Sequence, residues 1–210
     1  KECYNEEFQS KLIVVTKIHP RSYMPHLMKA SLEKSQLDLY GKSRKLDIAL
    51  LHAPFCWQGH CTPQQASYSW LTAWKNLEQL HHEGYVSAIG VSNLDARQLQ
   101  DLLKFANTRV SVIQNWMDPF HQDKEVRSIC HQYNIVYMAY SSLGGQWEYF
   151  ENVRHNPVIV NPILQNIAAK HNTTISSVVL SWVLAEGAII IPRSSKKENV
   201  QKNAELLTTN

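Results

Sequence analysis

Two residues that could take part in proton transfer stand where apolar runs of the sequence end. Lys17 closes the run at 12–17, and His52 closes the run at 46–52. A lysine at the end of a strand can lower the pKa of a neighbouring acid or form a Schiff base, and a histidine can hydrogen-bond a reacting oxygen. Each residue alone is more often a solvated lysine or a structural histidine, so the pair gains weight only from what accompanies it.

Neutral hydrogen-bonding groups close the next two apolar runs. Ser92 and Asn93 end the segment IGVSN, and Gln114 ends SVIQ. Side-chain amides both donate and accept, which suits a planar carboxamide ligand, although serine and asparagine also bond the local backbone before a helix. Tyr140, in MAYSSLGG, offers an aromatic face that could stack on a cofactor ring or pack in the core.

A basic segment follows the last apolar run. In IIIPRSSKKENVQKN, Arg193 comes before two serines and two lysines at the predicted start of a helix. Helix N-termini bind phosphate through free N–H groups, and an arginine adds paired hydrogen bonds to the same anion. The segment predicts a phosphate site, with a merely solvated basic helix start as the alternative.

Such groups must be held by regular elements, and the sequence alternates two periodicities that supply them. Because parallel strands need a crossover of a dozen or more residues, short apolar runs that alternate with helical segments predict an α/β fold with a parallel sheet. The predicted strands are 12–17, 46–52, 86–93, 110–114, 135–141 and 188–194. The predicted helices are 25–40, 63–83, 96–105, 124–133, 161–171, 175–185 and 196–207, with Thr62, Asp95 and Asp123 as candidate N-caps.

The strand ends distinguish a closed barrel from an open sheet. All six predicted strands end in groups that hydrogen-bond or carry charge, and a (β/α)8 barrel gathers the carboxyl ends of its strands around one mouth. An open dinucleotide-binding sheet would carry GxGxxG after a strand, and none of the seven glycines forms that pattern. The strand ends therefore favour a barrel.

Composition argues against several other classes of function. The 210 residues carry a formal net charge of +3 with both signs interspersed, so no nucleic-acid partner is indicated. The apolar runs are too short to span a membrane, and four scattered cysteines do not make a disulfide framework, so we expect a cytoplasmic protein without a membrane partner. Cys56, His60 and Cys61 fall short of a zinc site because they offer one sulfur pair and a single histidine. No metal is expected.

Taken together, these segments resemble the aldo-keto reductase family. The match runs in register over about residues 11–203, through VTKIHP, LDIALLHAP, EGYVSAIGVSN, QNWMDPF, VYMAYSSLGG and IIIPRSSKKENVQKN. Several motifs in one order are far more specific than any one of them. The resemblance implies a single (β/α)8 TIM-type barrel domain over residues 1–210, with six of the eight strands present in this chain.

The resemblance also implies a role for each candidate residue. Lys17 and His52 match the catalytic lysine, which lowers the pKa of a tyrosine acid, and the catalytic histidine, which orients the carbonyl. The other matches hold the cofactor NADPH, with NAD as the alternative. They are Ser92, Asn93 and Gln114 at the nicotinamide carboxamide, Tyr140 under its ring, Ser141 and Leu143 along the pyrophosphate, Arg193 and Ser194 at the 2′-phosphate, and Asn203 at the adenine.

The sequence also departs from the family pattern. The strand, helix and strand that come first in the family, with the catalytic aspartate and tyrosine, have no counterpart here, nor does the C-terminal loop. Asn199 stands where an arginine commonly stacks on the adenine, which weakens the preference for NADP. Trp116, Asp118 and Ala53 replace a glutamate, a histidine and a tryptophan, so we expect an unusually shaped substrate pocket.

These observations predict an NADP-dependent oxidoreductase that reduces a small-molecule aldehyde or ketone to an alcohol. Two alternatives stay open. One is a cofactor-binding barrel without turnover, resembling the β-subunits of potassium channels, and the other is an unrelated barrel that uses Lys17 as a Schiff-base nucleophile. The missing strands are also expected to leave 12–17 and 188–194 as apolar edges prone to pairing with other chains.

Overall fold

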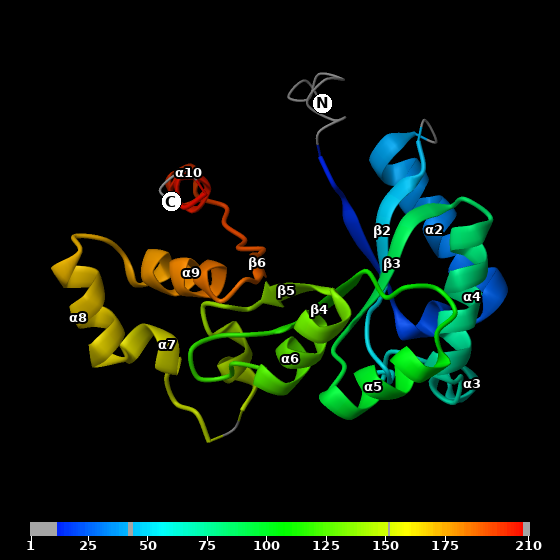
Figure 1. The fold of residues 1–210 in the computed structure, drawn as a ribbon, viewed down its shortest axis with the longest axis horizontal. Helices are drawn as coiled ribbons and strands as arrows, with labels where there is room; N and C mark the ends of the chain where they lie inside the picture. Colours follow the sequence, from blue (N-terminus) through cyan, green and yellow to red (C-terminus); the bar gives the residue numbers. More distant parts are fainter. Residues whose placement is uncertain (1–11, 42–43, 151, 208–210) are drawn as a thin grey trace. The chain divides into compact units, whose positions relative to one another are not determined.

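The structure is a computed structural model that describes residues 12–41, 44–150 and 152–207. The chain forms two compact units, Lys1–Val112 and Ile113–Asn210, which are described in turn (Figure 1).

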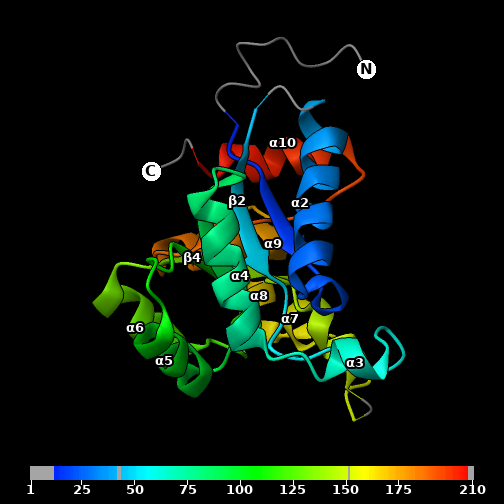
Figure 2. The same ribbon diagram turned by 90° about the vertical axis from the view of Figure 1, so that its right-hand side faces the viewer.

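The first unit contains three strands with helices between them. Its elements are β1 (Val15–Ile18), η1 (Pro20–Ser22), α2 (Pro25–Tyr40), β2 (Leu46–Leu51), α3 (Pro63–Ala66), α4 (Trp70–His82), β3 (Val86–Ser92) and α5 (Ala96–Phe105). All pairing is parallel, with Thr16 of β1 opposite Ala49 of β2, and Ala49 opposite Ile89 of β3. The long helices α2 and α4 are the crossovers between these strands and lie side by side along them (Figure 2).

Local signals set the helix boundaries of this unit. Thr62 and Asp95 both form capping boxes. In each, the side chain of the cap accepts from the backbone N–H of the glutamine three residues later, and the side chain of that glutamine accepts from the backbone N–H of the cap. The predicted helix 63–83 is broken in two because Ser69 starts a new helix, its hydroxyl accepting from the N–H of Thr72. A second N-cap in the middle of a helical pattern therefore separates α3 from α4.

The core of the first unit lies between the strands and α4. Trp74, Leu77, Leu50 and Ile89 are all completely buried. Gly90 of β3 has no room for a side chain, because a Cβ atom there would collide with the carbonyl oxygen of Val112 and with the side chain of Leu50. Close backbone approach at this glycine keeps the carboxyl end of β3 aligned with its neighbours.

One buried carboxylate, Glu78 of α4, ties the helix to the loop after α5. Its Oε1 accepts from the indole of Trp74 at 2.9 Å and from the N–H groups of Asn107 and Thr108 at 2.6 and 2.7 Å. Its Oε2 accepts from Lys75 at 2.9 Å. Burial by itself would raise the pKa of Glu78, but these hydrogen bonds hold the pKa below its usual value.

The second unit continues the alternation of strands and helices (Figure 1). Its elements are β4 (Val112–Trp116), α6 (Lys124–Tyr133), β5 (Val136–Tyr140), η2 (Gly145–Tyr149), α7 (Pro157–Val160), α8 (Pro162–Lys170), α9 (Ile175–Ala185), β6 (Ile189–Ile190) and α10 (Lys197–Glu205). The strands follow chain order, and β5 and β6 pair in parallel with Met138 opposite Ile189. Six strands alternate with helices over the described residues, so the predicted α/β class of (β/α)8 type is confirmed.

Two local predictions for this unit are wrong. β6 covers two residues where 188–194 was predicted, and the chain leaves the sheet just before Pro192, which has no N–H to donate to a ladder. Asp123 precedes α6 but does not cap it, because its backbone is left-handed, with φ of 48°. Its carboxylate instead accepts from Tyr137 at 2.7 Å and from Asn115 at 2.9 Å.

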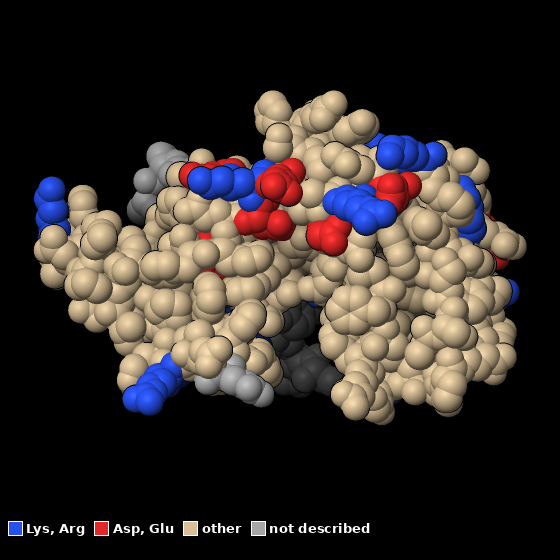
Figure 3. Space-filling model, turned by 90° about the horizontal axis from the view of Figure 1, so that it is seen from below, with Lys and Arg blue, Asp and Glu red and all other residues tan. Residues whose placement is uncertain are grey.

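Apolar side chains are exposed near the first and last strands, where the sequence predicted apolar sheet edges. Ile13, just before β1, is 74% exposed, and Ile189 of β6 is 45% exposed. On the face drawn in Figure 3, acidic and basic side chains lie next to one another, and neither sign forms a separate patch. Among the described residues, no helix is both long enough and apolar enough to cross a membrane.

Candidate active site

The first unit brings four predicted site residues together at the carboxyl ends of its strands. Lys17 lies on β1, His52 directly follows β2, Ser92 is the last residue of β3, and Asn93 follows it. The backbone N–H of His52 donates to the carbonyl of Ile18 at 3.0 Å. The amide of Asn93 donates to the carbonyl of His52 at 2.8 Å and to the hydroxyl of Ser92 at 3.1 Å. The three strand ends are therefore held together by hydrogen bonds.

Asn93 reaches this position because its backbone is left-handed, with φ of 61°. Asparagine tolerates this conformation better than most residues do. Ser92 is completely buried, so its hydroxyl lies inside this cluster and away from the surface.

Burial changes the proton affinity of the two candidate catalytic groups. It lowers the pKa of Lys17 from 10.5 to about 8. It also lowers the pKa of His52 from 6.5 to about 4, with smaller contributions from the positive charges of Lys17 and His19. At neutral pH the arrangement therefore pairs a neutral imidazole with a mostly protonated ammonium, a combination typical of acid–base sites.

A buried tyrosine, not expected from the sequence, fixes the residue after His52. The hydroxyl of Tyr23 donates to the carbonyl of Ala53 at 2.6 Å and accepts from its N–H at 3.2 Å. Burial raises the pKa of Tyr23, so the phenol stays protonated. Tyr23 and Ala53 lie 30 positions apart in the sequence, so no local sequence pattern predicts this contact.

Aromatic rings and a disulfide surround His52. The ring of Trp57 lies 4.9 Å from that of His52 and 5.3 Å from that of His19, measured between centroids. Cys56 and Cys61 form a disulfide, although the sequence predicted no disulfide framework. The cysteines therefore no longer support the expected cytoplasmic location.

In the second unit, Gln114 and Tyr140 lie on the neighbouring strands β4 and β5. Gln114 is buried, and its amide donates to the sulfur of Met138 at 2.9 Å. Tyr140 ends β5, and burial together with the charge of Asp123 raises its pKa to about 12. Its phenol is therefore neutral at physiological pH and offers an uncharged ring face.

Two cavities follow the carboxyl ends of β5 and β6. The first, of about 240 Å³, is lined by Ser141, Leu143 and Arg193 among others. Ser142 also lines it, and the buried hydroxyl of Ser142 has no hydrogen-bond partner among the described residues. A buried polar atom without a partner costs stability, which is the usual mark of a position that a ligand or a water completes.

The second cavity, of about 110 Å³, is lined by the other residues that were predicted to bind the cofactor. Leu143, Arg193, Ser194 and Asn203 all line it. Residues that sequence reasoning did not select also contribute: Thr174, Ser176 and Ser177 from the start of α9, and Asn199 and Lys202 from α10. The hydroxyl of Ser194 accepts from the side chain of Asn199 at 3.2 Å and from the N–H of Lys196 at 3.1 Å.

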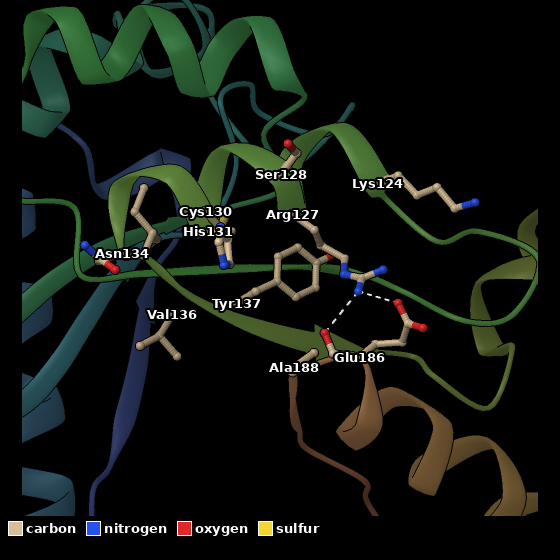
Figure 4. Close-up of a pocket in the computed structure, with 12 residues that line it drawn as sticks. Lys124, Arg127, Ser128, Cys130, His131, Asn134, Val136, Tyr137, Glu186 and Ala188 are labelled. Carbon is tan, nitrogen blue, oxygen red and sulfur yellow. Dashed lines mark hydrogen bonds and ion pairs between the residues drawn. The ribbon is translucent and has the colours of Figure 1, made fainter.

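A larger cavity of about 680 Å³ lies at the other ends of these strands. It is lined by α6, the start of β5 and the segment before β6, and the ion pair between Arg127 and Glu186 crosses it (Figure 4). Active sites of parallel barrels form at the carboxyl ends of strands, so this cavity is a poor candidate for the chemistry. It contains none of the predicted site residues.

Comparison with known proteins agrees with the fold. The aldo/keto reductase family model matches residues 1–210. The 9,11-endoperoxide prostaglandin H2 reductase of Trypanosoma cruzi is 34% identical over 75% of this chain, and the glyoxal reductase of Bacillus subtilis is 32% identical over 84%. The crystal structure of a Bombyx mori aldo-keto reductase in complex with NADP superposes with a TM-score of 0.81 at 23% identity over 94% of this chain.

The chain spans 50%, 54% and 63% of the lengths of these three relatives. Because the family model covers all 210 residues, the chain belongs to the aldo/keto reductase family.

Proposed function

We propose that this protein reduces aldehydes or ketones to alcohols with hydride from NADPH. The observation that carries the proposal is the cluster of Lys17 and His52 at adjacent strand ends, with both pKa values lowered by burial. The similarity to the glyoxal reductase of Bacillus subtilis and to the aldose reductase B of Dictyostelium discoideum supports a carbonyl as the substrate.

The second unit fits the phosphates of such a cofactor. Ser142, whose buried hydroxyl has no partner among the described residues, lines a cavity of about 240 Å³, and Arg193 lines both this cavity and the one of about 110 Å³. We assign Ser141 and Leu143 to the pyrophosphate, Arg193 and Ser194 to the 2′-phosphate, and Asn203 to the adenine. Lys202 adds a second cation at the cavity of about 110 Å³, where Asn199 provides no charge.

The nicotinamide end is assigned by family membership. Ser92, Asn93 and Gln114 supply the hydroxyl and amide groups for its carboxamide, and Tyr140 supplies a neutral aromatic face for the ring. When bound, NADPH supplies the hydride that reduces the carbonyl carbon.

His52 and Lys17 then act on the carbonyl oxygen and its proton donor. A neutral imidazole donates a hydrogen bond to the carbonyl oxygen and orients it without competing for the proton. Hydride transfer leaves a negative oxygen that needs a proton, and the tyrosine acid of the family pattern has no counterpart in this sequence. We therefore assign this proton to a water molecule whose pKa the Lys17 ammonium lowers. Because the pKa of Lys17 is about 8, catalysis should fall as the pH rises above that value.

Turnover tests the proposal directly. Oxidation of NADPH is followed by the loss of its absorbance in the presence of glyoxal and a panel of aldehydes and ketones, with His171→Gln as a surface control for His52→Gln. We expect His52→Gln to lower kcat/KM by about 10²- to 10⁴-fold, the range for a positioned acid–base group. Cofactor binding without any carbonyl reduction would overturn the proposal in favour of a binding module without turnover.

A further inference from the structure

The loop that follows β2 folds back on itself and places two cysteines face to face. Residues 57–60 form a β-turn, in which the N–H of His60 donates to the carbonyl of Trp57 at 3.0 Å. Gly59, the third residue of this turn, has the positive φ of 78° that a type II turn needs there. Cys56 and Cys61 flank this turn with their Cα atoms 6.2 Å apart and form a disulfide. Both are half-buried.

His19 approaches the same two sulfur atoms from a different strand. It follows β1, and the pairing of Ile18 with Leu51 brings the ends of β1 and β2 level with each other. One ring nitrogen of His19 and the two sulfur atoms all lie within 4.8 Å of one another. The sequence alone offered only His60 as a histidine near these cysteines, because His19 lies far away along the chain.

Two thiolates and one imidazole are a ligand set that zinc uses in proteins. With three protein ligands, zinc keeps its fourth position open for water. Zn–S bonds of about 2.3 Å in tetrahedral geometry put the two sulfur atoms about 3.8 Å apart. The Cα atoms of Cys56 and Cys61 are 6.2 Å apart, a spacing from which two cysteine side chains can bind one zinc ion.

We propose that reduction of the Cys56–Cys61 disulfide opens a zinc site formed by His19, Cys56 and Cys61, with water in the fourth position. The reductant is a dithiol, which gives up two electrons and two protons and itself becomes a disulfide. The two thiols formed on the chain then release their protons as Zn²⁺ binds, and the neutral complex of Zn²⁺ with two thiolates leaves no net charge beside Arg21.

The ring of His19 makes a hydrogen bond in the disulfide form of the chain. Its Nδ1 accepts from the N–H of Arg21 at 3.2 Å. Zinc binding breaks this one long hydrogen bond whichever ring nitrogen is the ligand, because a neutral imidazole has a single acceptor nitrogen.

The proposed zinc site lies beside the candidate catalytic histidine but shares no residue with it. The ring of Trp57 is close to both, with its centroid 5.3 Å from that of His19 and 4.9 Å from that of His52, and the two histidine rings are themselves 6.2 Å apart. Zinc binding therefore has a spectroscopic readout in tryptophan fluorescence that does not depend on reductase activity.

Cobalt titration of the chain, reduced with a dithiol and then freed of it without exposure to air, tests the site. We expect one Co²⁺ per chain with a thiolate charge-transfer band that Zn²⁺ displaces, and no band in the oxidised chain. Cys56→Ser and Cys61→Ser should abolish the band, and His19→Ala should weaken binding by about tenfold or more. The exposed His171→Ala should bind as the unchanged chain does. Equal binding by His19→Ala, or no band in the reduced chain, would overturn the proposal.

Alkylation of the unchanged chain tests whether Cys56 and Cys61 bind zinc, and it does so even if a variant does not fold. Iodoacetamide should modify Cys56 and Cys61 of the reduced chain, and one equivalent of Zn²⁺ should slow both reactions at least tenfold, as read by peptide mass. Cys130 is buried, with its pKa raised to about 12, and serves as the internal reference. Equal alkylation rates with and without Zn²⁺ would contradict the zinc site.

Discussion

Replacing Lys17 with methionine should make the fold more stable while removing activity. Burial lowers the pKa of Lys17 from 10.5 to about 8. A tenfold change in proton affinity corresponds to about 1.4 kcal/mol, so keeping this ammonium charged near neutral pH costs the fold up to about 3 kcal/mol. Methionine keeps most of the side chain's apolar volume without the charge. We therefore expect Lys17→Met to raise the free energy of unfolding by about 1–3 kcal/mol at pH 7.

The pH dependence of that gain follows from linkage. The folded chain loses the Lys17 proton near pH 8 and the unfolded chain near pH 10.5. Between these values the unfolded state binds more protons, so the stability of the unchanged chain rises with pH. The advantage of Lys17→Met should be largest below pH 8 and should shrink as the pH approaches 10.5.

Urea unfolding followed by tryptophan fluorescence at pH 7 and pH 10 measures both effects. Lys34→Met is the matched control, because the Lys34 side chain is 75% exposed and makes only a surface ion pair with Asp38. This control should change the unfolding free energy by less than about 1 kcal/mol at either pH. A Lys17→Met chain that unfolds at lower urea than the unchanged chain, or a gain that is the same at both pH values, would refute a desolvated ammonium at this strand end.

Two further substitutions test other buried polar groups. Glu78→Gln should lower the free energy of unfolding by about 1.5–3 kcal/mol in urea at pH 7, because it loses charged hydrogen bonds, and the surface change Glu83→Gln should cost less than about 0.5 kcal/mol. Folding lowers the pKa of Glu78 below its usual 4.5, so its contribution should be complete at pH 7 and should shrink as the pH falls below that usual value; a gap as large at pH 3 as at pH 7 would contradict this. Ser142→Ala should leave the cofactor-free chain as stable or more stable in thermal unfolding, because the hydroxyl has no described partner, yet weaken NADPH binding in calorimetry by about three- to tenfold. Unchanged NADPH affinity would remove Ser142 from the proposed site.

Elements with local causes were predicted well from the sequence. Thr62 and Asp95 were predicted as N-caps, and both cap their helices, each within a capping box that spans four residues of chain. The failures involve competing or distant partners. Ser69 competes with helix continuation, and Asp123 prefers Tyr137 and Asn115 to its own helix.

The same distinction applies to the candidate site. Lys17, His52 and Ser92 could be predicted as candidates because polar residues at the ends of apolar runs are visible in a sequence. The hydrogen bonds of Tyr23 with Ala53 and the approach of His19 to the Cys56–Cys61 disulfide depend on strand register. Register is a property of the folded sheet, because it depends on which strands pair and on which face of each is buried.

Calorimetric titration of the chain with NADPH and with NADH tests the central claim most directly. The proposal predicts that NADPH binds more tightly than NADH and that Arg193→Ala weakens NADPH about 10- to 100-fold, the value of a charged hydrogen bond, while leaving NADH nearly unchanged. Arg154→Ala, a change at an exposed arginine that lines neither cavity, should alter neither affinity. Absence of binding by a folded sample, or equal losses for both cofactors in Arg193→Ala, would contradict the assignment of Arg193 to a 2′-phosphate.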